Sequence, residues 1–193
     1  MNATPTPAPR SPEPRRRNRL MLLALVAVFF VPILAAFLLN WGGALPPPKT
    51  NGEYLKPMRD LRALAPRLAE GGEYRWEPAA RRWRVVIVPQ PGCAEECVEA
   101  ARKVDLVWQL LGKNADHVDI LWLGAPPAQA RRNAATRVLE PAPALLEALP
   151  RVPDGRGVPV YVIDPNGFVV LRYAPGFAPK GLLDDLNKLV KLM

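Results

Sequence analysis

The chain has 193 residues, a formal net charge of +8, two cysteines, one histidine and one serine. The serine, Ser11, lies in a tail rich in alanine, threonine and proline, which excludes a Ser-His-Asp hydrolase. Two cysteines and one histidine are too few for a zinc site built from several such ligands. The hydrophobic share of 49% is that of a globular protein, and the length allows one domain with an appendage.

The N-terminal region divides into a basic tail and an apolar stretch. Residues 1–19 contain five prolines and five arginines against one acidic residue, so we expect a disordered tail. Residues 20–39 carry no charged or hydrogen-bonding side chain. At about 1.5 Å per residue they span a bilayer, and residues 20–40 are predicted to be a transmembrane signal anchor. A cleaved signal peptide and a buried helix of a soluble protein are the alternatives, but the apolar run is long for either.

The arginines before this stretch predict its orientation. They cluster within residues 15–19, whereas the other flank has no charge before Lys49. By the positive-inside rule the N-terminus faces the cytoplasm. The prediction is a single-pass protein of the bacterial inner membrane with its C-terminal domain in the periplasm. Residues 41–50, with three consecutive prolines, are expected to be a stiff linker.

Residues 51–193 are predicted to form one α/β domain. Their scattered basic residues lack an aromatic stripe, so the expected partner is the membrane and no nucleic acid. The start is weakly patterned, with a short strand near 53–55 and a helical turn near 59–68. Hydrophobic periodicity then predicts a strand, a helix, a strand, one or two helices, two strands joined by the Asn166-Gly167 turn, and a closing helix. These elements cover 83–88, 95–111, 118–123, 128–149, 159–163, 168–173 and 180–192. Their order is that of a thioredoxin-like fold, a mixed central sheet with flanking helices.

Cys93 and Cys97 lie between the first of these strands and its helix. If the helix starts near Cys93, the two Cα atoms are about 6 Å apart, within the range for a disulfide. The helix N-terminus stabilises a thiolate, although Glu95 and Glu96 oppose it. We therefore expect a redox-active or metal-binding pair, with Cys93 as the attacking thiol. A structural disulfide or two buried cysteines remain the alternative, although so short a loop removes little chain entropy.

Several segments together carry a family resemblance. The run WRVVIVPQPGCAEEC, the helix and strand after it, GVPVYVIDPNGFVVLRY and the closing helix resemble the Sco/SenC family of membrane-anchored thioredoxin-like proteins. The resemblance loosely covers residues 52–193. It implies a cytochrome c oxidase assembly factor that carries copper, or reduces cysteines, for the binuclear copper centre. Oxidase subunits or other assembly factors are the implied partners.

The resemblance also implies a metal site, from which this chain departs. The family uses the two cysteines of C-x-x-x-C, here Cys93 and Cys97, and a histidine that would fall at about Arg156. An arginine cannot replace an imidazole as a copper ligand, and His117 is expected to be an exposed loop residue. The two thiolates alone could still hold Cu(I), which is a soft ion.

Pro159 stands just before the strand at 159–163. Thioredoxin-like domains that exchange disulfides often have a cis-proline there, and the alternative is a trans proline at a strand start. Three functions remain open for the domain. They are thiol-disulfide exchange in oxidase assembly, a Cu(I) chaperone, and a non-catalytic membrane-tethered interaction protein.

Overall fold

The computed structural model describes residues 13–41, 49–154 and 157–192. The chain divides into two units, Met1–Pro47 and Pro48–Met193, which are described separately. The predictions for residues 1–12 and for most of the linker, residues 42–48, lie outside the described residues.

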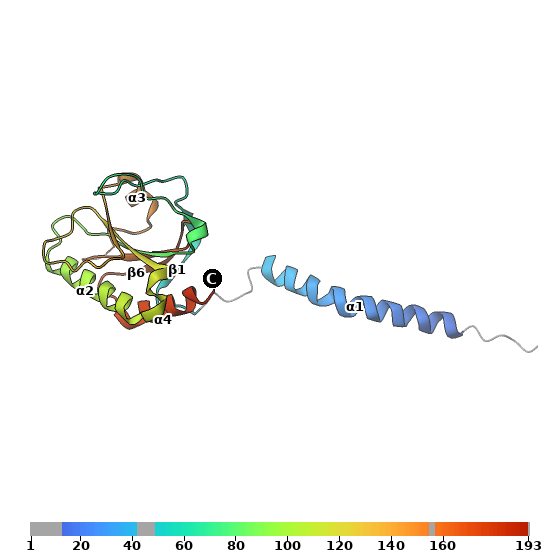
Figure 1. Cartoon of the computed structure of the whole chain (residues 1–193). Coiled ribbons are helices and arrows are strands. Elements are labelled where there is room, and N and C mark those ends of the chain that lie inside the picture. Colours follow the sequence, from blue (N-terminus) through green and yellow to red (C-terminus); the bar gives the residue numbers. More distant parts are fainter. Residues whose placement is uncertain (1–12, 42–48, 155–156, 193) are drawn as a thin grey trace, which may run out of the picture. The chain divides into compact units, whose positions relative to one another are not determined.

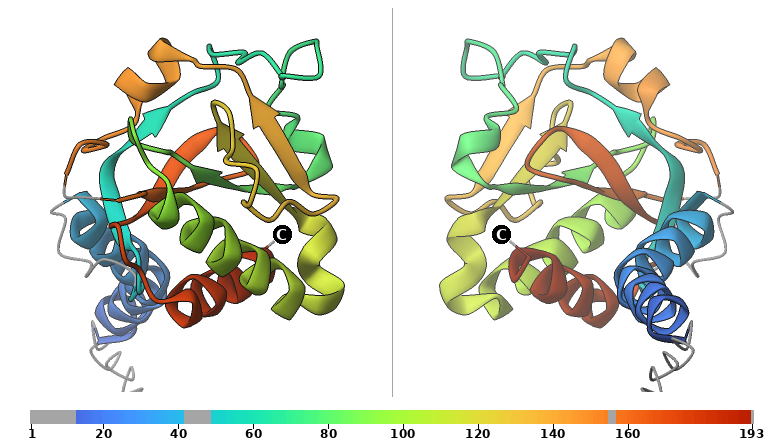
Figure 2. Two further views of the ribbon diagram at one scale, coloured as in Figure 1. Left: turned by 90° about the vertical axis from the view of Figure 1, so that its left-hand side faces the viewer. Right: turned by 90° about the vertical axis from the view of Figure 1, so that its right-hand side faces the viewer.

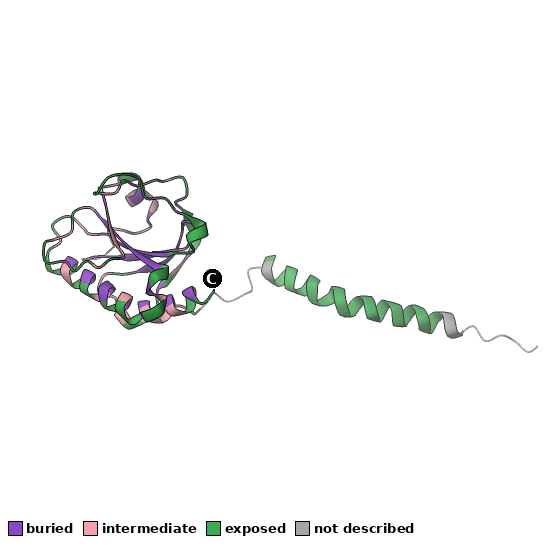
Figure 3. Ribbon diagram, in the orientation of Figure 1, coloured by how far each residue is buried: buried purple, intermediate pink, exposed green. Residues whose placement is uncertain are grey.

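The described part of the first unit is one helix, α1 (Glu13–Trp41) (Figure 1). The side chains of residues 16–39 are exposed (Figure 3). The segment Arg16–Leu39 is long and apolar enough to cross a membrane. Its 24 residues extend about 36 Å, more than the roughly 30 Å of a hydrocarbon core. The helix begins before the predicted boundary at residue 20 because arginine is a good helix former and the turn continues through the basic cluster.

The second unit is built on a six-stranded mixed sheet of order β1-β6-β5-β2-β3-β4. The strands are β1 (Glu53–Asp60), β2 (Trp83–Ile87), β3 (Val118–Leu123), β4 (Thr136–Leu139), β5 (Val160–Ile163) and β6 (Phe168–Tyr173). β3 pairs in parallel with β2 and β4, whereas the other pairs are antiparallel. The β5–β6 hairpin turns at Gly167, whose φ of 96° favours glycine. This turn lies where the Asn166-Gly167 pair predicted it.

Helices cover both faces of the sheet (Figure 2). α2 (Glu95–Leu110) and α4 (Pro179–Val190) pack side by side on one face. The short helix α3 (Pro143–Ala148) and the segment 61–76 cover the other, where Leu61, Trp76 and Leu145 join the core. Two 3-10 helices, η1 (Pro78–Ala80) and η2 (Gly112–His117), complete the unit. With both faces covered, every residue of the central strand β2 is buried, and the mixed α/β, thioredoxin-like fold is confirmed.

Two segments differ from the sequence prediction. Within residues 128–149, expected to be one or two helices, Thr136–Leu139 is the strand β4, and only α3 is helical. Pairing with the open edge of β3 satisfies the backbone of β4 and buries Leu139 completely. The predicted helical turn at 59–68 is also wrong, because β1 continues to Asp60. This edge strand accommodates Pro57, with a cis Lys56–Pro57 bond and a register shift against β6.

Candidate redox site

Cys93 and Cys97 form a disulfide at the start of α2, with their Cα atoms 5.7 Å apart. β2 ends at Ile87, and a short loop brings Cys93 to the helix, whose first turn contains Cys97. Within this loop the N–H of Cys93 donates to the carbonyl of Gln90 at 3.1 Å. The pair therefore lies at the strand-to-helix junction where the sequence placed it.

The two sulfurs differ in accessibility. Cys97 is 1% exposed and lies on the side of α2 that packs into the core, whereas Cys93 is partly exposed. A reacting thiol from outside can therefore approach Cys93 more readily than the buried Cys97. The residue before the helix, Ala94, offers no side-chain cap, so the N–H groups of the first turn are left to stabilise charge on a sulfur.

A groove of about 680 Å³ opens beside Cys93. We call it the cysteine groove. One wall is the outward face of α2, and the other is the loop that follows β3. Its lining includes Cys93, Glu95, Val98, Glu99, Arg102 and Pro127. Apart from Cys93, none of these residues was predicted to line a groove, although the spacing of 95, 98, 99 and 102 marks one helix face.

The histidine of the chain is remote from the cysteines. His117 ends η2 and directly precedes β3, whereas Cys93 follows β2. β2 and β3 are parallel, with Trp83 opposite Val118 and Ile87 opposite Trp122. His117 thus lies at one end of these strands and the cysteines beyond the other, about 16 Å apart along the strand direction. It is exposed, as predicted.

The described residues offer no third ligand for a metal at the cysteines. They contain no cluster of three or more histidine, cysteine, aspartate or glutamate side chains that could hold a metal ion. Arg156, at the position of the family histidine, lies outside the described residues. Two thiolates, once reduced, are a donor set that suits Cu(I), but a three-ligand site is not formed by the described part of the chain.

Pro159 has its peptide bond in the trans form, since the cis bond in the described part of the chain is Lys56–Pro57. Of the two alternatives for Pro159, the cis form is therefore wrong. The carbonyl of Pro159 accepts the N–H of Val88 at 3.2 Å, which extends the β2–β5 pairing by one step. A proline that begins a strand needs no special isomer, because its missing N–H lies outside the ladder.

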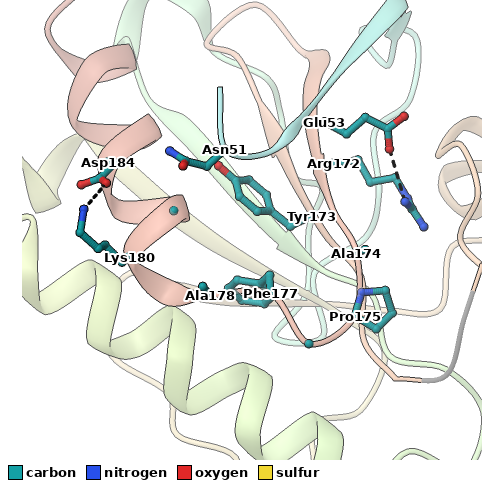
Figure 4. Close-up of a pocket in the computed structure, with 12 residues that line it drawn as sticks. Asn51, Glu53, Arg172, Tyr173, Ala174, Pro175, Phe177, Ala178, Lys180 and Asp184 are labelled. Carbon is teal, nitrogen blue, oxygen red and sulfur yellow. Dashed lines mark hydrogen bonds and ion pairs between the residues drawn. The ribbon is translucent and has the colours of Figure 1, made fainter. Parts of the chain in front are cut away.

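A second pocket, of about 610 Å³, lies between β1, the end of β6 and the start of α4 (Figure 4). Two ion pairs stand on opposite sides of the Tyr173 ring. Arg172 contacts Glu53 at 3.5 Å, and Lys180 contacts Asp184 at 2.5 Å. The Arg151 guanidinium holds the pKa of Glu53 below its usual value. These charges neutralise one another and the pocket contains no cysteine, so we assign it no chemistry.

Comparisons with known proteins agree with this fold. A family model described as the transmembrane-like, thioredoxin-like C-terminal domain matches residues 83–193, and one described as the transmembrane-like N-terminal domain matches residues 12–41. A search of curated proteins finds no match.

Similar solved structures include apo Sco1 from Thermus thermophilus, with 17% identity and a TM-score of 0.54 over 73% of this chain and 97% of that chain. Yeast Sco1 with copper bound has 15% identity and a TM-score of 0.54 over 73% and 95%. BsSco, described as a Sco-family cytochrome c oxidase assembly protein with a disulfide switch, has 11% identity and a TM-score of 0.51 over 75% and 98%. The predicted resemblance to Sco proteins is confirmed in the fold. Since the C-terminal model covers more than half of the chain, this protein belongs to the family of transmembrane-like, thioredoxin-like proteins.

Proposed function

We propose that the protein is a membrane-tethered thiol-disulfide exchange factor that assists assembly of the copper centre of cytochrome c oxidase. The observation that carries the proposal is the disulfide between a partly exposed Cys93 and a buried Cys97 at the start of α2. Stability alone is a weak reason for such a bridge, because it closes a loop of only a few residues. The Sco-like fold supports the oxidase as the setting.

Exchange from the oxidised form would proceed in two steps. A thiolate of the partner attacks the Cys93 sulfur, the bond to Cys97 breaks, and Cys97 leaves as a thiolate that takes up a proton. A second partner thiol then attacks the partner sulfur of the mixed disulfide and releases Cys93 as a thiolate. The partner dithiol is oxidised to a disulfide, and the Cys93–Cys97 pair is reduced. The reverse sequence would reduce a partner disulfide.

Trapping of the mixed disulfide tests this proposal. The full chain with Cys97→Ala cannot form the internal disulfide, but its Cys93 thiolate can attack a partner disulfide in the reverse sequence. Because no Cys97 thiol resolves the product, acid quenching and thiol blocking should recover a reductant-sensitive adduct through Cys93. The matched Cys93→Ala chain also keeps one thiol, but this thiol belongs to the buried Cys97 and should yield no adduct. Absence of an adduct in both would refute exchange with a partner disulfide. An adduct with an oxidase subunit or assembly factor supports the assembly role. Normal oxidase assembly with the double alanine variant would leave only a non-catalytic interaction role.

Cu(I) binding by the same two thiolates is the second candidate, favoured by the close approach of two soft ligands. Bound copper would be held by Cys93 and Cys97 and passed on by ligand exchange, in which the ligands of the receiving site replace the two thiolates. The test is titration of the reduced full chain in detergent with Cu(I) against a mild chelator, with thiols counted before and after. Uptake of one equivalent that Cys93→Ala abolishes would support the chaperone. Loss of all copper to the chelator would exclude it.

We also propose the placement that these functions need. α1 would anchor the chain in the bacterial inner membrane with the N-terminus in the cytoplasm, and residues 51–193 would lie in the periplasm behind a linker at 41–50. The arginines at the start of α1 support this orientation. An oxidising periplasm would favour the disulfide form of the pair.

A further inference from the structure

We propose that the cysteine groove binds an extended partner segment whose reactive cysteine is accompanied by a basic residue and, further along, by an acidic one. The inference rests on the proposed exchange function and names the class of segment that reaches Cys93. Its basis is the arrangement of charge and apolar surface along one face of α2.

The groove begins at the sulfur that reacts. Cys93 is part of its lining, and Cys97 lies beneath within the core. A thiolate that attacks Cys93 in line with the departing Cys97 sulfur must come from the solvent side. The chain that carries this thiolate then lies over Cys93, and the residues next to it enter the groove.

Charge along the groove changes sign with distance from Cys93. Glu95 is nearest, is exposed and forms no ion pair with other described residues. Arg102, also exposed and without an ion pair in the described part of the chain, is at the far end. Glu99, between them, is neutralised by Lys103 at 2.9 Å, and hydrogen bonding to that lysine lowers the pKa of Glu99. The groove thus offers an exposed carboxylate near the sulfur and, further on, an exposed guanidinium that also attracts Glu99.

Apolar side chains also line the groove. Val98 lies between Glu95 and Arg102 on α2, Pro127 belongs to the facing loop, and both are partly buried. Glu95 and Arg102 are seven residues apart on a helix, which is about 10 Å. An extended chain covers this distance in about three residues. The matching segment therefore has a cysteine, a lysine or arginine within two positions of it, an apolar residue, and an acidic residue about three positions beyond the basic one.

Synthetic peptides test the match with the full chain in detergent. One peptide has a cysteine, a neighbouring lysine, a valine and a glutamate three positions after the lysine, and its partner exchanges the two charges. Both are also made in reversed order, since the groove does not define the direction of the segment. The rate at which each opens the Cys93–Cys97 disulfide is divided by its rate with hydroxyethyl disulfide, which removes differences in thiol reactivity.

We expect the matching peptide, in one of the two directions, to react about fivefold faster than its charge-exchanged partner at low salt, and the preference to disappear at high salt. Glu95→Gln should remove most of the preference, and Arg102→Gln should remove the contribution of the glutamate. Glu96→Gln is the matched control. Glu96 lies in the same first turn of α2 but lines a different pocket with Val158 and Phe177, so the preference should remain.

Three results would overturn the inference. Equal rates for all peptides would show that the groove does not select charge. Loss of the preference in Glu96→Gln as well would show that the preference comes from the overall electrostatic potential at the start of α2 and not from the groove. A faster reaction with glutathione than with any peptide would assign the groove to a small thiol. If dithiothreitol itself cannot open the disulfide, the exchange function fails instead, which separates the two proposals.

Discussion

The side-chain amide of Gln90 donates a hydrogen bond to the carbonyl of Val152. Gln90 lies in the loop between β2 and α2, which we call the cysteine loop, and its own carbonyl accepts the N–H of Cys93 at 3.1 Å. Val152 belongs to the loop that precedes β5. A single side chain therefore joins the loop that carries the reactive sulfur to a second loop far away in the sequence.

Replacement of Gln90 by alanine should loosen the cysteine loop. We expect Gln90→Ala to cost about 1 kcal/mol in the free energy of unfolding and to speed amide exchange at Gly92 and Cys93. The rate at which dithiothreitol reduces the disulfide should also change. Gln109→Ala is the matched control, because Gln109 also makes one side-chain hydrogen bond, to Asp105 at 2.8 Å on α2. An identical change of the reduction rate in both variants would contradict a specific role for Gln90.

Asp185 fixes the start of β1 to α4. Its buried carboxylate accepts the N–H groups of Asn51 and Gly52 at 2.7 and 2.9 Å and the hydroxyl of Tyr173 at 2.7 Å. Burial raises the pKa of Asp185, but the hydrogen bonds from Tyr173, Gly52 and Asn51 outweigh it and hold the pKa below its usual value. Gly52 is required here, because a Cβ atom would lie 2.6 Å from the Tyr173 ring.

Asp185→Asn should therefore destabilise the domain by about 2 kcal/mol at pH 7, since the amide replaces one acceptor oxygen with a donor. A carboxylate with a lowered pKa stabilises the folded state above its unfolded pKa of about 3.9. This stability is lost as the pH falls through the folded pKa, so the gap between wild type and variant should narrow from pH 5 to pH 2. Denaturant titration measures both. Asp184→Asn, which removes only an exposed pair with Lys180, should cost less than about 0.5 kcal/mol.

Much of the fold follows from local pattern, and the exceptions have a physical cause. The β-branched runs at Trp83–Ile87 and Val118–Leu123 are buried on both faces, so their sequences alone indicate strands. β4 has only four residues, of which Leu139 alone is buried, and it exists because β3 has an open edge. The strand predicted near 53–55 is the start of β1, but the rest of β1 contains a proline and three charged residues, so its extension to Asp60 has no local signal.

The candidate site shows the same division. The position of Cys93 and Cys97 could be predicted from the sequence, because the strand and the helix on either side of them have clear hydrophobic patterns. The groove could not be predicted, because Pro127 comes from a loop whose course depends on the unpredicted strand β4. The Gln90–Val152 contact likewise joins segments that only the sheet order brings together.

Tyr74 links two buried charges on the face of the sheet opposite α2. Its hydroxyl donates to Asp119 at 3.1 Å and accepts the Nε–H of Arg84 at 2.9 Å. Tyr74→Phe would leave both with an unmet hydrogen bond and should cost about 2 kcal/mol. Tyr54→Phe, at a tyrosine whose hydroxyl has no hydrogen bond to the described residues, is the control and should cost far less.

The same tyrosine predicts an alkaline effect. Burial raises the pKa of Tyr74 to about 12. A raised pKa gives stability that is present below the unfolded value of about 10 and is lost as the pH rises towards 12. The advantage of wild type over Tyr74→Phe should therefore shrink between pH 8 and pH 11 in urea unfolding. An advantage that grows over this range would contradict the raised pKa of Tyr74.

The arginines at the start of α1 predict which side of the membrane exposes Cys93. After reduction with a membrane-impermeant phosphine, an impermeant maleimide should label Cys93 in intact cells, whereas Cys97, at 1% exposure, stays unlabelled. Replacing Arg16, Arg17 and Arg19 by glutamine should reduce this labelling, because it removes three of the five tail arginines and weakens the charge bias on which the proposed orientation rests. Replacement by lysine keeps the charge and should leave labelling unchanged. Labelling of the wild type only after cell lysis would place the domain on the cytoplasmic side and remove the oxidising compartment on which the exchange proposal depends.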